Sequence, residues 1–181
     1  FGQRSQLYWD LPVSDTFELY EKLYDIPREV YMRNRDYYTE LFQMEDFIDQ
    51  PVRQLSLGQK MKANIAIALL HDPEVLYLDE PTIGLDVMSK KVLRESIRRI
   101  NQEKGMTIIL TTHDMDDIEA VCSRLILIDQ GRKLFDGTLS RFKEEHHRDN
   151  MIKLEFKREM PEWKEQDGLS LAEAADSCWR I

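Results

Sequence analysis

The first 50 residues carry apolar and aromatic positions at intervals of three and four, with charged residues filling much of the space between them. This spacing predicts two charged helices, of which the second covers residues 29–43. Ser14 or Asp15 is expected to cap the first helix, because Asp15 and Glu18 have the spacing of a capping box. Neither helix carries residues typical of catalysis, so we expect them to form a helical subdomain on a catalytic core.

After residue 51 the pattern changes to helices that alternate with short apolar runs. Continuous apolar runs predict strands, and we expect the first two to be buried on both faces. The predicted strands are 75–78, 107–112, 125–129 and 133–135, and the predicted helices are 58–70, 87–101 and 116–123. Gly105 is expected to close the second of these helices. The alternation predicts an α/β domain with a parallel sheet. After residue 143 the chain turns polar; residues 151–157 alternate like an exposed strand, and 161–181 yield no prediction.

Composition narrows the class of protein. The net charge of −9 argues against a sequence-independent nucleic-acid binder, so we expect no nucleic-acid partner. The apolar runs 65–70 and 108–110 are far shorter than the roughly 18 residues that a membrane span needs. Two cysteines, Cys122 and Cys178, fit a reducing cytosol, and no secretory leader is expected. Membrane association is therefore expected only through a protein partner.

Two consecutive carboxylates, Asp79 and Glu80, follow the apolar run 75–78. The carboxyl edge of a parallel sheet is where α/β proteins bind ligands, and successive residues there point in different directions. The two carboxylates can therefore divide the work of a site; the alternative is a solvated acidic turn. His113 follows the strand 107–112 and is expected at the same edge, although a single histidine at a strand end is often structural.

Two further segments combine a helix start with polar side chains. Ser56, followed by Leu57 and Gly58, opens the helix predicted over 58–70. A serine hydroxyl and free backbone N–H groups at a helix start suit a phosphate, although a plain N-cap would have the same residues. Asp86 precedes the helix 87–101 and is expected to cap it.

Read in order, these segments resemble the second half of an ATP-binding cassette (ABC) ATPase. The sequences that carry the resemblance are Leu55-Ser56-Leu57-Gly58-Gln59, Val75-Leu76-Tyr77-Leu78-Asp79-Glu80-Pro81, Ile83-Gly84-Leu85-Asp86 and Thr111-Thr112-His113. The resemblance covers about residues 1–139 and is nearest to bacterial ABC-2-type exporter ATPases. It implies a P-loop NTPase (RecA-like) fold of the α/β class, with a parallel sheet core and a helical subdomain.

The sequence contains no G-x-x-x-x-G-K-S/T phosphate loop, which such ATPases need. We therefore expect an N-terminally truncated domain with its phosphate loop (Walker A) upstream, poor in ATP affinity by itself and inactive alone. The expected organisation is a partial ABC ATPase domain over 1–142 and a C-terminal extension over 143–181. Within the former, 1–58 would hold the Q-loop and helical subdomain, and 59–142 the catalytic core.

The resemblance also implies a role for each matching residue at the hydrolytic site. Asp79 matches the Walker B aspartate, which holds Mg²⁺. Glu80 matches the glutamate that orients or deprotonates the attacking water, and His113 matches the histidine that contacts the γ-phosphate. Gln3 resembles the Q-loop glutamine, which reaches both the Mg²⁺ and the water and links the site to the transmembrane partner.

The remaining matches imply contacts to ATP across a dimer. Ser56, Leu57, Gly58 and Gln59 match the signature segment, which binds ATP held by the opposite subunit, and Leu57 stands where the family commonly has glycine. Asp86 matches the D-loop, which crosses the dimer interface.

The resemblance therefore implies an ATPase that works as a pair of nucleotide-binding domains, in a homo- or heterodimer. The pair would drive transmembrane permease subunits of an exporter from the cytoplasmic face of the membrane, with ATP as substrate and Mg²⁺ as cofactor. Two alternatives remain open. One is a soluble ABC ATPase outside transport; the other is a non-catalytic cassette that contributes only its signature segment to a partner.

Overall fold

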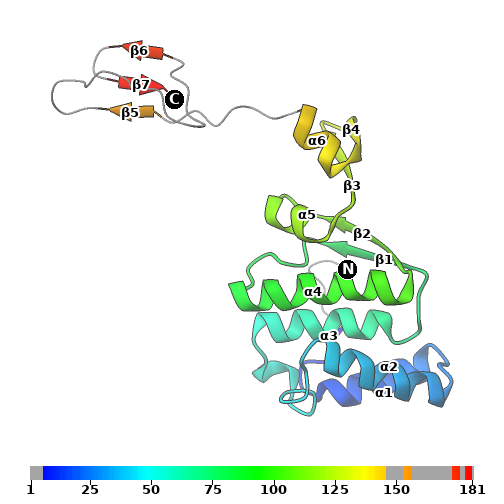
Figure 1. The fold of residues 1–181 in the computed structure, drawn as a ribbon. Coiled ribbons are helices and arrows are strands. Elements are labelled where there is room, and N and C mark those ends of the chain that lie inside the picture. The colour runs from blue at the N-terminus through cyan, green and yellow to red at the C-terminus, as the bar shows by residue number, and fades with distance from the viewer. Residues whose placement is uncertain (1–5, 146–152, 156–172, 176–177, 181) are drawn as a thin grey trace. The chain divides into compact units, whose positions relative to one another are not determined.

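The computed structural model describes residues 6–145, 153–155, 173–175 and 178–180, with side chains for the first of these ranges. The chain divides into two compact units, residues 1–125 and 126–181. In the first unit, helices α3 and α4 lie between a pair of strands and the helices α1 and α2 (Figure 1). This layering places the two strands on one side of the helices, as expected for an α/β domain.

The first two helices are α1 (Val13–Leu23) and α2 (Arg28–Leu41). Both begin after a proline N-cap, so the prediction that Ser14 or Asp15 caps α1 is wrong. Those two residues lie inside its first turn. The amide of Ser14 donates to the carbonyl of Ile48 at 2.9 Å, so a loop distant in sequence partners a helix-start N–H that a side-chain cap would otherwise satisfy. A local capping pattern does not reveal such a partner.

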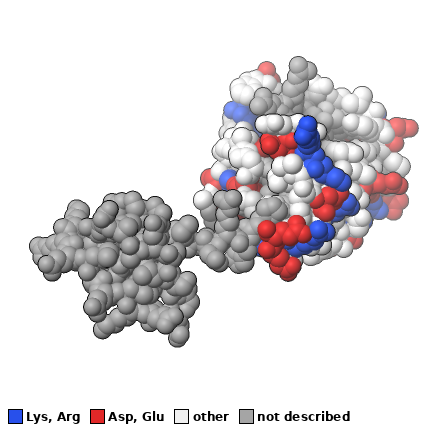
Figure 2. Space-filling view, turned by 90° about the horizontal axis from the view of Figure 1, so that it is seen from above, with Lys and Arg blue, Asp and Glu red and all other residues white. Residues whose placement is uncertain are grey.

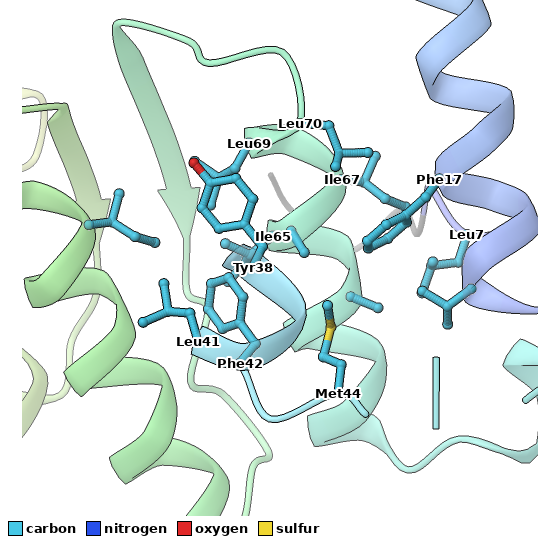
Figure 3. Packing of buried hydrophobic residues seen from close by; sticks show 14 of the residues in the cluster. Leu7, Phe17, Tyr38, Leu41, Phe42, Met44, Ile65, Ile67, Leu69 and Leu70 are labelled. Carbon is cyan, nitrogen blue, oxygen red and sulfur yellow. The ribbon is translucent and has the colours of Figure 1, made fainter. Parts of the chain in front are cut away.

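Helix α3 (Leu57–Leu69) follows a 3₁₀ turn, η1 (Val52–Gln54), and helix α4 (Val87–Lys104) follows the first strand. Gly105 ends α4 in the left-handed conformation, with φ at +64°, which confirms the predicted stop. Side chains of α1, α2, α3 and their connections meet in a continuous apolar core (Figure 3). The core residues labelled there are Leu7, Phe17, Tyr38, Leu41, Phe42, Met44, Ile65, Ile67, Leu69 and Leu70.

Strand β1 (Val75–Asp79) pairs in parallel with β2 (Thr107–Thr111), and α4 is the crossover between them. The predicted parallel pairing is confirmed. The prediction of two buried faces is wrong for the described residues: Leu76 and Leu78 are buried, whereas Tyr77 is 62% exposed and Ile109 is 44% exposed. An apolar run shows that both faces suit burial, but it does not show what packs on each.

After β2 come helix α5 (Met115–Val121) and strand β3 (Arg124–Asp129). Strand β3 pairs with β4 (Arg132–Thr138). Gln130 and Gly131 both have positive φ, 46° and 73°, as a tight two-residue hairpin turn requires.

The second unit continues with helix α6 (Leu139–Glu145). A three-stranded antiparallel sheet follows, in the order β5–β7–β6, made of β5 (Lys153–Glu155), β6 (Glu173–Ala175) and β7 (Cys178–Arg180). Strand β5 lies inside the predicted strand 151–157, whose other residues lie outside those described.

The described surface carries charges of both signs. Basic and acidic side chains are interspersed on the face in Figure 2. Several form ion pairs; for example, Asp72 lies 2.7 Å from both Arg33 and Lys104. No helix in the described part of the chain has the length and apolar character to cross a membrane.

Replacing Phe17 by alanine tests the core beneath α1. Phe17 is fully buried, so its truncation should lower the free energy of unfolding by about 3–5 kcal/mol. Leu23→Ala on the same helix is the control, because that side chain is 68% exposed and should change stability by about 0.5 kcal/mol or less. Urea denaturation measures both; equal losses would contradict the packing described.

Candidate functional site

The parallel pairing brings the ends of β1 and β2 to one edge, with Asp79 opposite Thr111 in the register. Glu80 follows the first strand, and His113 lies two residues beyond the second. Their side chains are in contact: His113 Nδ1 lies 2.8 Å from Glu80 Oε1. The prediction that these residues share a sheet edge is therefore confirmed. The structure joins two groups that are 33 positions apart in the sequence.

The backbone of Glu80 is unusual for a residue with a side chain. Its φ of +47° lies in the left-handed region, which glycine adopts freely and other residues adopt at a cost. The Glu80 amide donates to the Thr111 carbonyl at 3.0 Å, which continues the β1–β2 pairing one residue beyond the strands. With this backbone conformation and this hydrogen bond, the Glu80 side chain points away from the direction of β1 and toward His113.

The hydrogen bond to Glu80 raises the pKa of His113 above its ordinary value of 6.5, and the negative charge of Glu80 adds to the effect. Asp114 and Asp117 raise this pKa further. The pair is open to solvent, with 76% of the His113 side chain and 32% of the Glu80 side chain exposed. Such a pair is accessible to a ligand and contributes little to folding stability.

Asp79 lies beside this pair and is also exposed. Its Oδ1 accepts a hydrogen bond from Thr111 Oγ1 at 2.5 Å, across the strand pair. The hydroxyl thus fixes one carboxylate oxygen of Asp79.

The start of α3 lies against the start of α4. Ser56 caps α3 in a full capping box, in which Ser56 Oγ accepts from the Gln59 amide and Gln59 Oε1 accepts from the Ser56 amide. Asp86 caps α4 by accepting from the Ser89 amide at 2.9 Å, as predicted. Gly58 packs so closely on Ser89 that an added Cβ would lie 2.9 Å from the Ser89 Cβ. Two helix N-termini therefore meet through a contact that only glycine allows.

Leu57 occupies the position at which the ABC family commonly has glycine, and it is 54% exposed. Its side chain lies against Gly84, where an added Cβ would be 3.2 Å from Leu57 Cδ2. Gly84 itself has a φ of +71°. The departure from glycine therefore places an apolar contact between the segment at 55–59 and the loop at 83–86.

Sequence reasoning missed a buried carboxylate next to the Glu80–His113 pair. Asp117 on α5 is 1% exposed and contacts Thr82, Thr112 and Arg94. In the sequence it is one of two adjacent aspartates on a short helix, and Asp116 beside it is exposed. The helical position of an acid does not by itself show that it is buried, so only the fold distinguishes the two.

Gln3 lies outside the described residues, and so do the side chains of Cys178 and of the histidines at 146 and 147. Within the described part, no cluster of three or more histidine, cysteine, aspartate or glutamate side chains could hold a metal ion by itself. Cys122 is free and half-buried, and burial raises the pKa of its thiol.

Comparison with known proteins identifies the family. Residues 6–116 match the family described as "AAA domain, putative AbiEii toxin, Type IV TA system". The ABC transporter ATP-binding protein NatA of Bacillus subtilis is 30% identical over 151 residues, which are 83% of this chain and 61% of NatA. Nod factor export ATP-binding protein I of Ralstonia nicotianae is 35% identical over 128 residues, which are 71% of this chain and 40% of that protein.

A solved structure agrees with these relatives. CbiO1 from Clostridium perfringens, described as part of the ABC transporter complex CbiONQ, aligns with a TM-score of 0.68 and 30% identity over 78% of this chain and 57% of its own. The chain thus spans less than two thirds of the length of each of these relatives. The ordered motifs, the parallel strand pair and these similarities show that the chain is a P-loop NTPase and belongs to the family of ATP-binding domains of ABC transporters.

Proposed function

We propose that this chain forms part of the ATP-hydrolysing subunit of an ABC exporter of the ABC-2 type. The observation that carries the proposal is the contact between Glu80 and His113 at the carboxyl edge of the strand pair, beside Asp79. A carboxylate and an imidazole in hydrogen-bond contact at an exposed edge can handle the proton of a water molecule and the charge of a phosphate. A solvated acidic turn would not require a hydrogen bond from Glu80 to a histidine 33 positions away in the sequence.

In this proposal Glu80 orients the attacking water and accepts its proton. His113 uses Nδ1 to hold Glu80 and presents its other ring nitrogen to the γ-phosphate. The raised pKa of His113 favours the protonated ring, which donates to an anionic phosphate more strongly than the neutral ring does. His113 is exposed and Glu80 is partly exposed, so a ligand can reach both side chains from solvent.

Asp79 is the residue that would hold Mg²⁺, together with Gln3. A lone exposed carboxylate fits that ion, because Mg²⁺ in nucleotide sites keeps several waters and uses one or two carboxylates plus the phosphates. The Mg²⁺ charge offsets that of the β- and γ-phosphates. Thr111 keeps Asp79 Oδ1 in place through its hydroxyl.

The segment formed by Ser56, Leu57, Gly58 and Gln59, with Asp86, is proposed to bind the ATP held by a second nucleotide-binding domain. The free amides at the start of α3 and the Ser56 hydroxyl are donors suited to a γ-phosphate. The 181 residues contain no phosphate-loop motif, so none of them is proposed to form that loop.

The partners proposed from the family are a second nucleotide-binding domain and transmembrane permease subunits, which would hold the chain at the cytoplasmic face of the membrane. Residues 1–142 are proposed as the ATPase part, with 1–58 as Q-loop and helical subdomain and 59–142 as catalytic core. Residues 143–181 form the extension.

Glu80→Gln in the full-length protein tests the hydrolytic role. The substitution removes the proton acceptor and keeps the shape, so ATP hydrolysis should fall by about 10²–10⁴-fold while nucleotide binding persists. Glu74→Gln is the control, because Glu74 is an exposed carboxylate that precedes β1 at the opposite edge. Phosphate release and nucleotide binding are measured for both. A wild-type rate in Glu80→Gln, or an equal loss in the control, would refute the proposal.

Removing Glu80 should also lower the pKa of His113 toward 6.5, because the hydrogen bond and the charge that raise it are lost. Since the folded-state pKa exceeds the unfolded value, the stabilisation from this pair is fully present below pH 6.5. It is lost as the pH rises through the raised pKa. Titration of the His113 ring by NMR, in wild type and Glu80→Gln, measures the shift. An unchanged pKa would show that the two groups do not interact in solution.

Gly58→Ala tests the close approach of α3 and α4. The new Cβ would overlap Ser89, so stability should fall by about 1–3 kcal/mol. Ser89→Gly removes the overlapping atoms, and the double variant should recover part of that loss. A double-mutant cycle by urea denaturation measures the coupling between the sites. Strictly additive effects would show that the helices are farther apart than described.

A further inference from the structure

We propose that Asp117 is a positioning residue that ties together the two loops carrying Glu80 and His113. The effect of Asp117 on catalysis rests on the proposed function. The connection that Asp117 makes between the two loops rests only on the geometry of the first unit. Asp117 belongs to α5, which follows His113, and its carboxylate accepts hydrogen bonds from Thr82, Thr112 and Arg94. It acts through the threonines beside them.

The two carboxylate oxygens of Asp117 have separate partners. Oδ1 accepts from Arg94 of α4, with Nε at 2.6 Å and Nη2 at 2.5 Å. Oδ2 accepts from the hydroxyls of Thr82 and Thr112, the latter at 3.2 Å. One oxygen therefore anchors the carboxylate to a helix, and the other joins two loops.

These threonines are next to the proposed chemistry. Thr82 lies two residues after Glu80, and Thr112 directly precedes His113. Because both hydroxyls meet the same oxygen, a shift of either loop changes the contact made by the other. The distance between Glu80 and His113 therefore depends on hydrogen bonds to one buried atom, Asp117 Oδ2.

Burial makes the hydrogen bonds of Asp117 costly to break. Asp117 is 1% exposed, and a buried carboxylate is costly unless its charge is paired and its oxygens accept hydrogen bonds. Arg94 supplies the charge, and its side chain is 20% exposed. Thr82 is also buried, so its hydroxyl has no easy replacement partner in water. Moving a loop would leave buried polar atoms unpaired.

The Glu80–His113 pair needs such support. An exposed pair of this kind gains little from its own attraction, because water screens it. The left-handed backbone of Glu80 adds a cost that the surrounding structure has to offset. The hydrogen bond from the Glu80 amide to the Thr111 carbonyl holds the backbone at one point, and the hydrogen bond from Thr82 to Asp117 holds the same turn at a second.

Thr82→Val and Thr82→Ser test the proposal as a matched pair in the full-length protein. Valine keeps the shape and removes the hydroxyl, whereas serine keeps the hydroxyl. In Thr82→Val, kcat for ATP hydrolysis should fall by about 10–100-fold with KM changed by about twofold or less, since small misplacements of reacting groups carry losses of this size. Thr82→Ser should keep kcat within about threefold of wild type. An unchanged kcat in Thr82→Val, or an equal loss in both variants, would overturn the proposal.

The His113 titration gives a readout that does not depend on activity. Glu80, Asp114 and Asp117 all raise the pKa of His113, and Thr82→Val leaves these three charges in place. If the tie holds the pair together, the pKa in Thr82→Val should fall toward that in Glu80→Gln. A wild-type pKa would overturn the positioning role. If Glu80→Gln hydrolyses ATP normally, the proposed function fails, and this titration still decides the tie.

Thermal unfolding shows whether each variant is folded under the assay conditions. If Thr82→Val is not, Thr112→Val and Thr112→Ser repeat the comparison from the second loop, because Thr112 bonds the same Asp117 oxygen. Asp116→Asn serves as the charge control, since Asp116 is the exposed neighbour of Asp117. A fall in kcat or in the His113 pKa for Asp116→Asn as large as that for the threonine variants would contradict the tie.

Discussion

The parallel pairing of β1 with β2 is the constraint from which the site follows. With Asp79 opposite Thr111, the next residues of both strands leave the sheet at one edge. A one-residue slip of this register would turn the side chains of one strand to the other face, because side chains alternate along a strand. Leu76 and Leu78 would then leave the helices that cover them, which makes the slip costly. Core packing thus fixes where the carboxylates and the histidine meet.

Two levels of polar contact surround that edge. The outer level consists of Asp79 and His113, which are exposed, and of Glu80, which is partly exposed. The inner level is Asp117 with Arg94 and the two threonines, which water does not reach as easily. An exposed ion pair costs little free energy to break, because water replaces the lost contact. A buried network costs more, because its polar groups would be left without hydrogen-bond partners. The arrangement places reactive groups at the surface and their alignment in the interior.

The start of α3 shows how the segment 55–59 is held within one chain. Its capping box pairs the amides of Ser56 and Gln59, and Gly58 lets α3 approach Ser89 of α4. Leu57 adds contact with Gly84. Because Asp86 caps α4 and Arg94 lies on it, one helix connects the segment 55–59, the loop 83–86 and the buried carboxylate. A movement of the segment 55–59 would therefore reach the Glu80–His113 pair through α4.

The sequence alone determined the α/β class, the approximate helices and strands, the stop at Gly105, and the placement of Glu80 and His113 at one edge of the sheet. Apolar periodicity, helix stops and short motifs are local signals, because each depends on a few residues that are neighbours in the sequence. Only the tertiary structure decided that Pro12 rather than Ser14 or Asp15 begins α1, that one face of β1 is exposed, and that Asp117 rather than Asp116 is buried. These outcomes depend on partners distant along the chain: Ile48 for the first, the covering helices for the second, and Arg94 with Thr82 for the third. A local pattern shows which contacts a residue can make, and the fold selects among them by bringing the partner within reach.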